Sequence, residues 1–289
     1  MSKLFVVATP IGNLGDMSPR AIATLQEADL ILAEDTRVTR KLLTAFDIKT
    51  PLESYHQHNE REKAAQVIAR MTERGMTVAL VSDAGMPAVS DPGALLVDAA
   101  HAAGIPVLCV PGPSAMAAAL SASGFMEAAF AFYGFLPRKK KELKDSLRAL
   151  QNGPPLAVIY ESPHRVLDLL RAIYEVYPGL TLSVSRELTK LHEHTLRGSA
   201  EEMLSYFTQH EEALRGEFAL VLRLPQTEEK QPASSVGMEA QLVDLMAQGH
   251  TLRDAQAALI AQGQRKNAVY AAALNLKKLA AEQLNAPDA

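Results

Sequence analysis

Short apolar runs alternate with amphipathic segments along the first part of the chain, and the runs have the length and aliphatic content of buried strands. The predicted strands are residues 4–8, 29–34, 52–56, 77–82 and 106–110. Predicted helices separate them at residues 36–46 and 59–74 and from about Ser18, Asp91 and Pro113 onward. Pro19 suits the first position of its helix. This alternation predicts an α/β layer with a largely parallel sheet.

The pattern changes after the fifth run. Further strands are predicted at residues 130–135, 156–160, 182–188, 194–198 and 218–224. Some of these strands are joined by segments too short for a helical crossover, which indicates antiparallel pairing. We therefore expect a second α/β domain with a mixed or antiparallel sheet.

A polar segment without apolar periodicity follows the last strand, which Pro225 ends. Beyond it, residues 238–248, 251–262 and 265–282 have the pattern of three short helices. Counting ~100–200 residues per domain, 289 residues suit more than one domain. The predicted division is 1–115, 116–225, a linker at 226–237 and a small helical domain at 238–289.

Composition limits the partners and the location. The net charge of −4 argues against a uniformly basic nucleic-acid-binding protein but allows local basic patches. The single cysteine, Cys109, lies in an apolar run, where we expect it to be buried; it excludes an internal disulfide and a cysteine-based zinc site. No signal peptide and no membrane span are predicted, so we expect a cytoplasmic protein.

Three loops that follow predicted strands carry unusual numbers of glycine, proline and acidic residues. They are residues 8–16, 81–93 and 110–115. Ligands of parallel α/β sheets bind where strands end and helices begin. Asp83 can accept hydrogen bonds from a ligand, whereas Asp91 is expected to be the N-cap of the next helix. Neither a dinucleotide fingerprint nor a Walker loop is present, so these loops predict another kind of small-molecule cleft.

Several charged clusters also follow strands. Glu34, Asp35 and Arg37 form one, and a helix cap with an ion pair explains it as well as chemistry does. His56 and His58 lack a third metal ligand at suitable spacing, so no metal site is predicted. Two more clusters, at residues 160–165 and 185–190, contain acids and bases that suit either a site or structural salt bridges. Their members are Glu161, His164, Arg165, Arg186 and Lys190.

A basic run begins the helix predicted after residue 137, and cations there oppose the helix macrodipole. The run contains Arg138, Lys139, Lys140 and Lys141. It is either a solvated helix start or a binding surface for a polyanion. The tail adds Arg265 and Lys266 in an outline that suits a helix–turn–helix, helix packing or a dimer contact.

Eight short motifs occur in order between residues 4 and 224: TPIGNLGD, AEDTR, SDAGMPAVSDPG, VPGPSA, GFLPRK, YESPHR, SRELTK and GEFALVL. Together they resemble the ribosomal RNA small subunit methyltransferase I family, within the tetrapyrrole-methylase superfamily. The resemblance implies two α/β domains, S-adenosylmethionine in the cleft between them, and a homodimer. It also implies 2′-O-methylation of a cytidine in the decoding region of 16S rRNA, in the small ribosomal subunit.

The resemblance also assigns residues. Ser82, Asp83 and Ala84 stand where the superfamily has a Gly-Asp-Pro cofactor loop. By the same resemblance, the remaining cofactor-binding residues are Pro10, Pro111 and Ser114 from the first domain and Tyr160, Leu182 and Ala219 from the second.

A ribose hydroxyl needs a proton acceptor as it attacks the methyl group. The candidates are Glu161, His164, Glu34 and Asp35, with Glu161 and Arg165 expected first. Other cations would hold phosphate or ribose: Arg37, Arg165, Arg186 and Lys190. The basic run 138–144 and the tail would anchor further phosphates.

Two other functions are compatible with the sequence. One is a methyltransferase for a tetrapyrrole or another small molecule, which would not need basic rims. The other is a non-catalytic RNA-binding factor for ribosome assembly, which would not bind S-adenosylmethionine.

Overall fold

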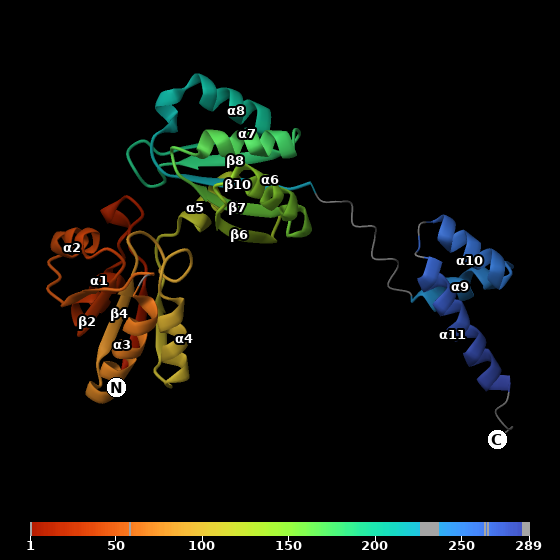
Figure 1. Cartoon of the computed structure of the whole chain (residues 1–289), viewed down its shortest axis with the longest axis horizontal. Helices are drawn as coiled ribbons and strands as arrows, with labels where there is room; N and C mark the ends of the chain where they lie inside the picture. Colours follow the sequence, from red (N-terminus) through yellow and green to blue (C-terminus); the bar gives the residue numbers. More distant parts are fainter. Residues whose placement is uncertain (1, 58, 226–236, 263, 265, 285–289) are drawn as a thin grey trace. The chain divides into compact units, whose positions relative to one another are not determined.

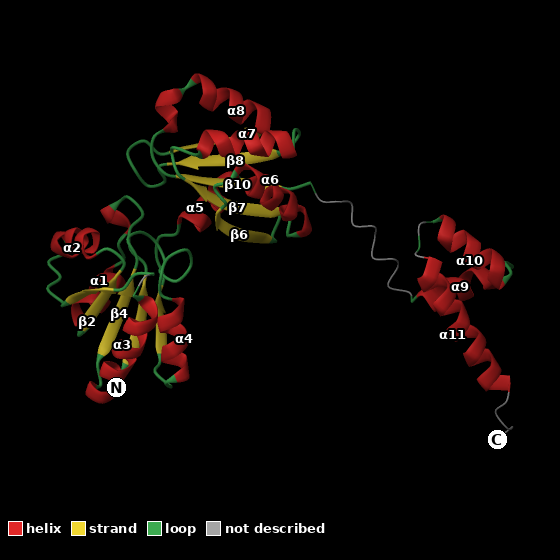
Figure 2. Cartoon of the chain, viewed as in Figure 1, coloured by secondary structure: helices red, strands yellow, loops and turns green. Residues whose placement is uncertain are grey.

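A computed structural model describes residues 2–57, 59–225, 237–262, 264 and 266–284 (Figures 1 and 2). The chain forms two compact units, residues 1–225 and 226–289. The first unit holds two five-stranded sheets, and the second is helical. The fold class expected from the sequence is confirmed. The predicted boundary at residues 115 and 116 stays a prediction, because both sheets belong to one compact unit.

All strands of the first sheet are parallel, in the order β3-β2-β4-β1-β5. They are β1 (Lys3–Val7), β2 (Leu30–Ala33), β3 (Leu52–Ser54), β4 (Thr77–Val81) and β5 (Val107–Val110). The connecting elements are η1 (Leu14–Asp16), α1 (Pro19–Glu27), α2 (Thr36–Ala45), α3 (Glu60–Arg74) and α4 (Ala94–Ala102). Each predicted strand lies within about two residues of an observed one.

The helices cover both faces of this sheet. Leu25 of α1 and Leu43 of α2 pack with Ile31 in one core cluster, whereas Met71 of α3 and Leu96 of α4 pack on the opposite face. The helices that follow the neighbouring strands β1 and β4 therefore lie on opposite faces. Where the connections from two neighbouring strands lead to opposite faces, a crevice opens at the carboxyl ends of these strands. Open α/β sheets bind their ligands in this crevice.

The second sheet is mixed, in the order β6-β7-β10-β8-β9, as the short connections predicted. Its strands are β6 (Phe130–Phe135), β7 (Leu156–Glu161), β8 (Thr181–Arg186), β9 (His194–Ser199) and β10 (Phe218–Arg223). Only β6 and β7 pair in parallel. The accompanying elements are α5 (Ala115–Ser123), α6 (Lys140–Ala149), η2 (Leu150–Asn152), α7 (Val166–Val176), α8 (Ala200–Gln209) and η3 (Glu211–Leu214).

The two faces of the second sheet have different neighbours. Residues of α6, α7 and α8 build the large core on one face. On the other face, Ala119 of α5 packs with Val158 of β7 and Ala219 of β10. Because α5 directly follows the loop after β5, it carries the chain from the first sheet onto the second.

The helical unit consists of α9 (Met238–Ala247), α10 (Leu252–Ala261) and α11 (Lys266–Leu284), close to the three predicted helices. Leu242, Leu259 and Val269, one from each helix, are buried together. The predicted linker at residues 226–237 lies, except for Gly237, outside the described residues. No helix in the described part of the chain has the length and apolar character to span a membrane.

Cys109 is exposed, so the expectation that it is a core residue is wrong. The run PVLCV forms β5, which is the edge strand of its sheet. Leu108 beside it is also exposed, at 37%. An apolar run predicts burial only where a neighbouring strand or helix covers it.

Candidate functional site

A cavity of about 370 Å³ is lined by residues from the strand-end loops of the first sheet and from the second sheet. Its volume lies in the range typical of small-molecule sites, ~300–1,000 Å³. The first part contributes Ile11, Ala84, Gly85, Asp91 and Ser114, and the second contributes Tyr160, Glu161, Ser162, Phe218 and Ala219. Predicted site residues from both halves are thus brought together, namely Ala84, Ser114, Tyr160, Glu161 and Ala219.

Two of the strand-end loops are joined by backbone hydrogen bonds. The N–H of Thr9 donates to the carbonyl of Gly85 (2.9 Å), and the N–H of Gly85 donates back to the carbonyl of Thr9 (3.0 Å). Gly85 has φ +82°, a conformation that a residue with a Cβ adopts only with strain. The loops after β1 and β4 therefore form one wall at the crevice between these strands.

The Ser82–Ala84 loop presents its three residues differently. Ser82 is buried and its hydroxyl lies near the carbonyls of Ala84 and Gly85. Asp83 accepts a hydrogen bond from the backbone N–H of Asp35 (3.0 Å), so its carboxylate supports the start of α2. Burial raises the pKa of Asp83. Of the three residues, only Ala84 lines the cavity.

Asp91 lines the cavity, and the expectation that it caps α4 is wrong. The N-cap of α4 is Gly93, whose N–H donates to Oε1 of Glu60 (2.9 Å). Pro92 and Gly93 delay the helix start, which releases the Asp91 carboxylate. Burial raises the pKa of Asp91, a hydrogen bond with Ser82 lowers it, and the charge of Asp83 raises it. A half-buried carboxylate in a cavity is suited to a cationic ligand.

Glu161 is the most buried acidic residue of the cavity, at 2% exposure. Its Oε1 accepts a hydrogen bond from the N–H of Ser162 (2.7 Å). Its Oε2 lies 3.2 Å from Nη2 of Arg165 but has no hydrogen-bond partner among the described residues. The ion pair with Arg165 offsets the cost of burying this charge, and Oε2 can accept a further hydrogen bond.

Arg165 fixes this carboxylate in place. Its Nη2 donates to the carbonyls of Leu136 (3.1 Å) and Pro137 (3.2 Å). The guanidinium thus joins the cavity to the segment that begins the basic run at Arg138.

An aromatic wall closes another side. Tyr160 contacts Phe132 and Phe135 edge-on, with ring centroids 4.8 and 5.9 Å apart, and Phe135 lines the cavity. Burial raises the pKa of the Tyr160 hydroxyl, which therefore stays protonated. Ala219 pairs with Tyr160 across β10 and β7 and lines the same cavity. This surface suits a flat ring such as adenine.

Leu182 does not reach the cavity with its side chain. It is fully buried with Leu220 and Leu222, on the helix-covered face of the second sheet. Pro10 and Pro111 adjoin the strand-end loops but are not among the residues that line the cavity. Side-chain alternation along β8 is the signal that separates Leu182 from the cavity face.

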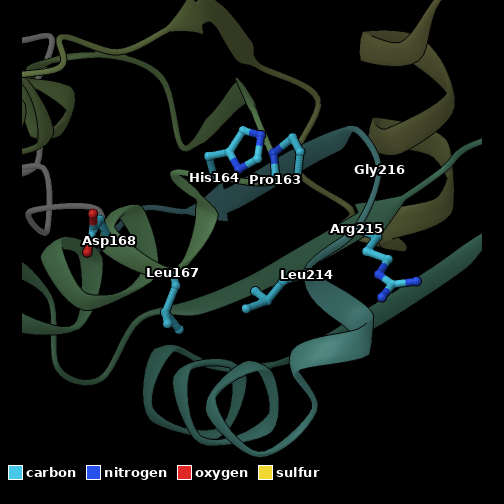
Figure 3. Close-up of a pocket in the computed structure, with 7 residues that line it drawn as sticks. All are labelled: Pro163, His164, Leu167, Asp168, Leu214, Arg215 and Gly216. Carbon is cyan, nitrogen blue, oxygen red and sulfur yellow. The ribbon is translucent and has the colours of Figure 1, made fainter.

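The other proton-acceptor candidates lie elsewhere. His164 is exposed and, beside Pro163, lines a neighbouring hollow of about 570 Å³, together with Leu167, Leu214 and Arg215 (Figure 3). Asp35 caps α2 and pairs with Arg37 (2.6 Å), whose hydrogen bond lowers its pKa to about 2. Glu34 is half-buried, and burial followed by the charges of Asp91 and Asp83 raises its pKa. The cap and ion pair expected for this cluster are confirmed.

Apart from Arg37, which pairs with Asp35, the predicted RNA-binding cations fall into two groups. Arg186 donates to the carbonyls of Glu212 and His192, and Lys190 pairs with Glu187 (2.9 Å) and Glu217 (3.0 Å), so both have structural partners. The other group is exposed: Arg138, Lys139, Lys140, Lys141 and, in the helical unit, Lys266. Arg265 lies outside the described residues.

The fold resembles known methyltransferase structures. Uroporphyrin-III-C-methyltransferase from Thermus thermophilus aligns with a TM-score of 0.52 over 76% of this chain and 93% of its own, at 23% identity. Diphthine synthase aligns with a TM-score of 0.58 over 77% of this chain and 90% of its own, at 14% identity. The family model described as tetrapyrrole (corrin/porphyrin) methylases matches residues 3–204. These findings define the class as a methyltransferase of the tetrapyrrole-methylase fold.

Closer relatives share one name, ribosomal RNA small subunit methyltransferase I. The protein from Synechocystis sp. is 44% identical over 87% of this chain and 89% of its own length. The protein from Pseudomonas aeruginosa is 43% identical over 94% of this chain and 96% of its own length. The chain belongs to the tetrapyrrole methylase family and, within it, to the ribosomal RNA small subunit methyltransferase I family.

Proposed function

We propose that this protein transfers a methyl group from S-adenosylmethionine to the 2′-oxygen of a cytidine in the decoding region of 16S rRNA. The relatives' printed name supports an RNA substrate from the small ribosomal subunit. The observation that carries the proposal is the cavity at the strand ends, which residues of both sheets line and which includes Glu161, a buried carboxylate held by Ser162 and Arg165. A cytoplasmic location follows from this substrate.

The cavity residues fit S-adenosylmethionine, the cofactor of methyltransferases of this family. A related uroporphyrin-III C-methyltransferase structure, with a TM-score of 0.51, contains S-adenosylhomocysteine. The cofactor supplies a methyl group on a positively charged sulfur, which is a good leaving group. Asp91 offers a carboxylate to that positive charge, and Tyr160 and Phe135 offer an aromatic surface to the adenine.

Glu161 is the proposed proton acceptor. A carboxylate at hydrogen-bond distance of the attacking hydroxyl contributes typically 10²–10⁴-fold to the rate. Glu161 is held by Ser162 and faced by Arg165, so one oxygen keeps a fixed position. Glu34, Asp35 and His164 do not line the cavity, which makes them weaker candidates.

Alignment of the ribose with the methyl donor is the larger contribution. Fixing two reactants in productive geometry contributes up to ~7–11 kcal/mol. Arg165 would orient Glu161, and the exposed cations Arg138–Lys141 would hold RNA phosphates. Sequence-specific recognition of RNA requires an unpaired, splayed nucleotide, and a cavity lined by both sheets suits a nucleotide turned out of a helix.

Homodimerisation is also proposed. Exposed apolar side chains lie on the edge strands β5 and β6 and between them, namely Leu108 (37%), Met126 (96%) and Phe130 (42%). Edge strands with uncovered apolar side chains are common at subunit interfaces. Analytical ultracentrifugation of the full chain tests this: a single monomeric species at micromolar concentration would contradict it.

The function is tested with purified small subunits from cells that lack the enzyme. The protein is supplied with methyl-labelled S-adenosylmethionine, and the labelled nucleotide is mapped, including its 2′-oxygen. Label on one cytidine 2′-oxygen of 16S rRNA is expected. Label on uroporphyrinogen instead of RNA would show a tetrapyrrole methyltransferase, and no cofactor binding would show a non-catalytic assembly factor.

A further inference from the structure

Helix α2 carries a row of positive charge, of which only Arg37 is among the RNA-binding residues predicted from the sequence. Arg37, Arg40 and Lys41 are exposed on the helix at positions i, i+3 and i+4, and with Thr44 they line a hollow of about 460 Å³. Residues at this spacing share one helix face. Thr39 and Leu43, on the opposite face, are buried. We call Arg37, Arg40 and Lys41 the α2 ridge.

The charge of the ridge is largely uncompensated. The segment Thr36–Ala45 contains no acidic residue, although the whole chain has a net charge of −4. Arg37 pairs with Asp35, but Arg40 and Lys41 form no ion pair with any described residue. Like charges at this spacing destabilise a helix by a few tenths of a kcal/mol per pair. An anionic ligand would offset that cost.

The ridge begins beside the proposed active site. The N–H of Asp35, which caps α2, donates to Oδ1 of Asp83 (3.0 Å), and Ala84 next to Asp83 lines the cavity. The first turn of α2 is therefore joined to the loop that lines the cavity, and we expect a substrate in the cavity to lie near it. The basic run Arg138–Lys141 is tied to the same cavity through Arg165.

We propose that the α2 ridge binds the phosphate backbone of the RNA next to the methylated nucleotide. This inference rests on the proposed function. From Arg37 to Lys41 the helix rises about 6 Å at ~1.5 Å per residue, which is comparable to the distance between two neighbouring phosphates along one nucleic-acid strand. The ridge contributes affinity and orientation without reading the sequence.

The test uses the double variant Arg40→Gln/Lys41→Gln in the full chain. Affinity for small ribosomal subunits is measured at several salt concentrations. Each lost phosphate contact lowers the slope of log affinity against log salt by ~0.7, so a decrease of about 1.4 is expected, with roughly tenfold weaker binding at moderate salt. Affinity for S-adenosylhomocysteine is expected to stay unchanged, which also shows that the variant is folded.

The control is Lys3→Gln/Arg74→Gln, which removes the same charge. Lys3 begins β1 and Arg74 ends α3, so both exposed cations lie at the opposite end of the first sheet. An equal slope for the ridge variant and this control would overturn the inference. Ridge-dependent binding to phosphatidylglycerol vesicles with unchanged binding to small subunits would overturn it too. If the wild-type protein neither binds nor methylates small subunits, the proposed function itself fails.

Discussion

Gly12 and Lys190 adjoin each other where the loop after β1 meets the segment after β8. A Cβ on Gly12 would overlap the aliphatic carbons of Lys190, and Gly12 has φ +152°. The ammonium of Lys190 is held by Glu187 and by Glu217, which lines the cavity. The absence of a side chain at residue 12 therefore sets how closely this loop approaches the second sheet.

Replacing this glycine is expected to disturb both stability and the cavity. Gly12→Ala should lower the free energy of unfolding by about 1–3 kcal/mol, because it combines backbone strain with displacement of Lys190. Urea denaturation measures the loss. The matched control is Gly104→Ala: Gly104 has φ +68° but open space around its Cβ position, so it reports strain alone. Equal losses in the two variants would show that the overlap with Lys190 is relieved without cost.

Removing the charge of Glu161 is expected to slow methyl transfer and spare cofactor binding. Glu161→Gln keeps an acceptor oxygen for Ser162 but cannot take up a proton, so kcat should fall by about 10²–10⁴-fold. Single-turnover methylation of small subunits and calorimetry with S-adenosylhomocysteine measure the two effects. Asp168→Asn, an exposed carboxylate in the first turn of α7, is the control. Wild-type turnover by a folded Glu161→Gln protein would assign the proton transfer to another group.

Asp91 is expected to distinguish the charged cofactor from its neutral-sulfur product. Asp91→Asn should weaken S-adenosylmethionine binding by about 10- to 100-fold, roughly 1.4–2.7 kcal/mol, because the amide no longer offsets the positive charge on sulfur. Affinity for S-adenosylhomocysteine should change little, because its sulfur carries no charge.

The same residue predicts a pH dependence. Burial raises the pKa of Asp91, so affinity for S-adenosylmethionine should increase as pH rises through a value above that of an ordinary aspartate. Titration calorimetry at several pH values measures it. A parallel change for both ligands would place the sulfur away from Asp91.

Glu34 predicts a pH-dependent stability. Its pKa is raised above 4.5 by burial and by the charges of Asp91 and Asp83. The folded protein therefore holds this proton more tightly than the unfolded chain, and stability falls as pH rises from the ordinary value through the raised one.

Glu34→Gln should accordingly be more stable than the wild type above that window, and the difference should vanish below about pH 4. Thermal unfolding between pH 4 and 7 measures it. Glu27→Gln, at the exposed end of α1, is the control. A Glu34→Gln protein no more stable than this control at pH 7 would contradict the prediction.

The sequence predicted the elements well because apolar periodicity depends on local packing. All ten predicted strands are present, and the short connections of the second half identified its mixed sheet. The cluster of Glu161 and Arg165 was predicted from its position after a strand. Their partners, Ser162 and the carbonyls of Leu136 and Pro137, required the structure because β6 and β7 pair across the intervening segment.

The wrong expectations have specific physical causes. Asp91 has the residue type of an N-cap, but Pro92 and Gly93 start the helix two residues later. Cys109 lies in an apolar run that happens to be an edge strand. The side chain of Leu182 lies in the core on the helix-covered face of the second sheet, and its assignment to the cofactor site stays a prediction.

The reciprocal hydrogen bonds between Thr9 and Gly85 have a kinetic consequence. Two loops that exchange both hydrogen bonds are expected to move as one unit. They therefore form one rigid wall of the cavity. On the second sheet's side of the cavity Phe135 is 60% exposed, so we expect a spent cofactor to leave past this ring. Turnover would be gated at that aromatic ring rather than at the glycine loop.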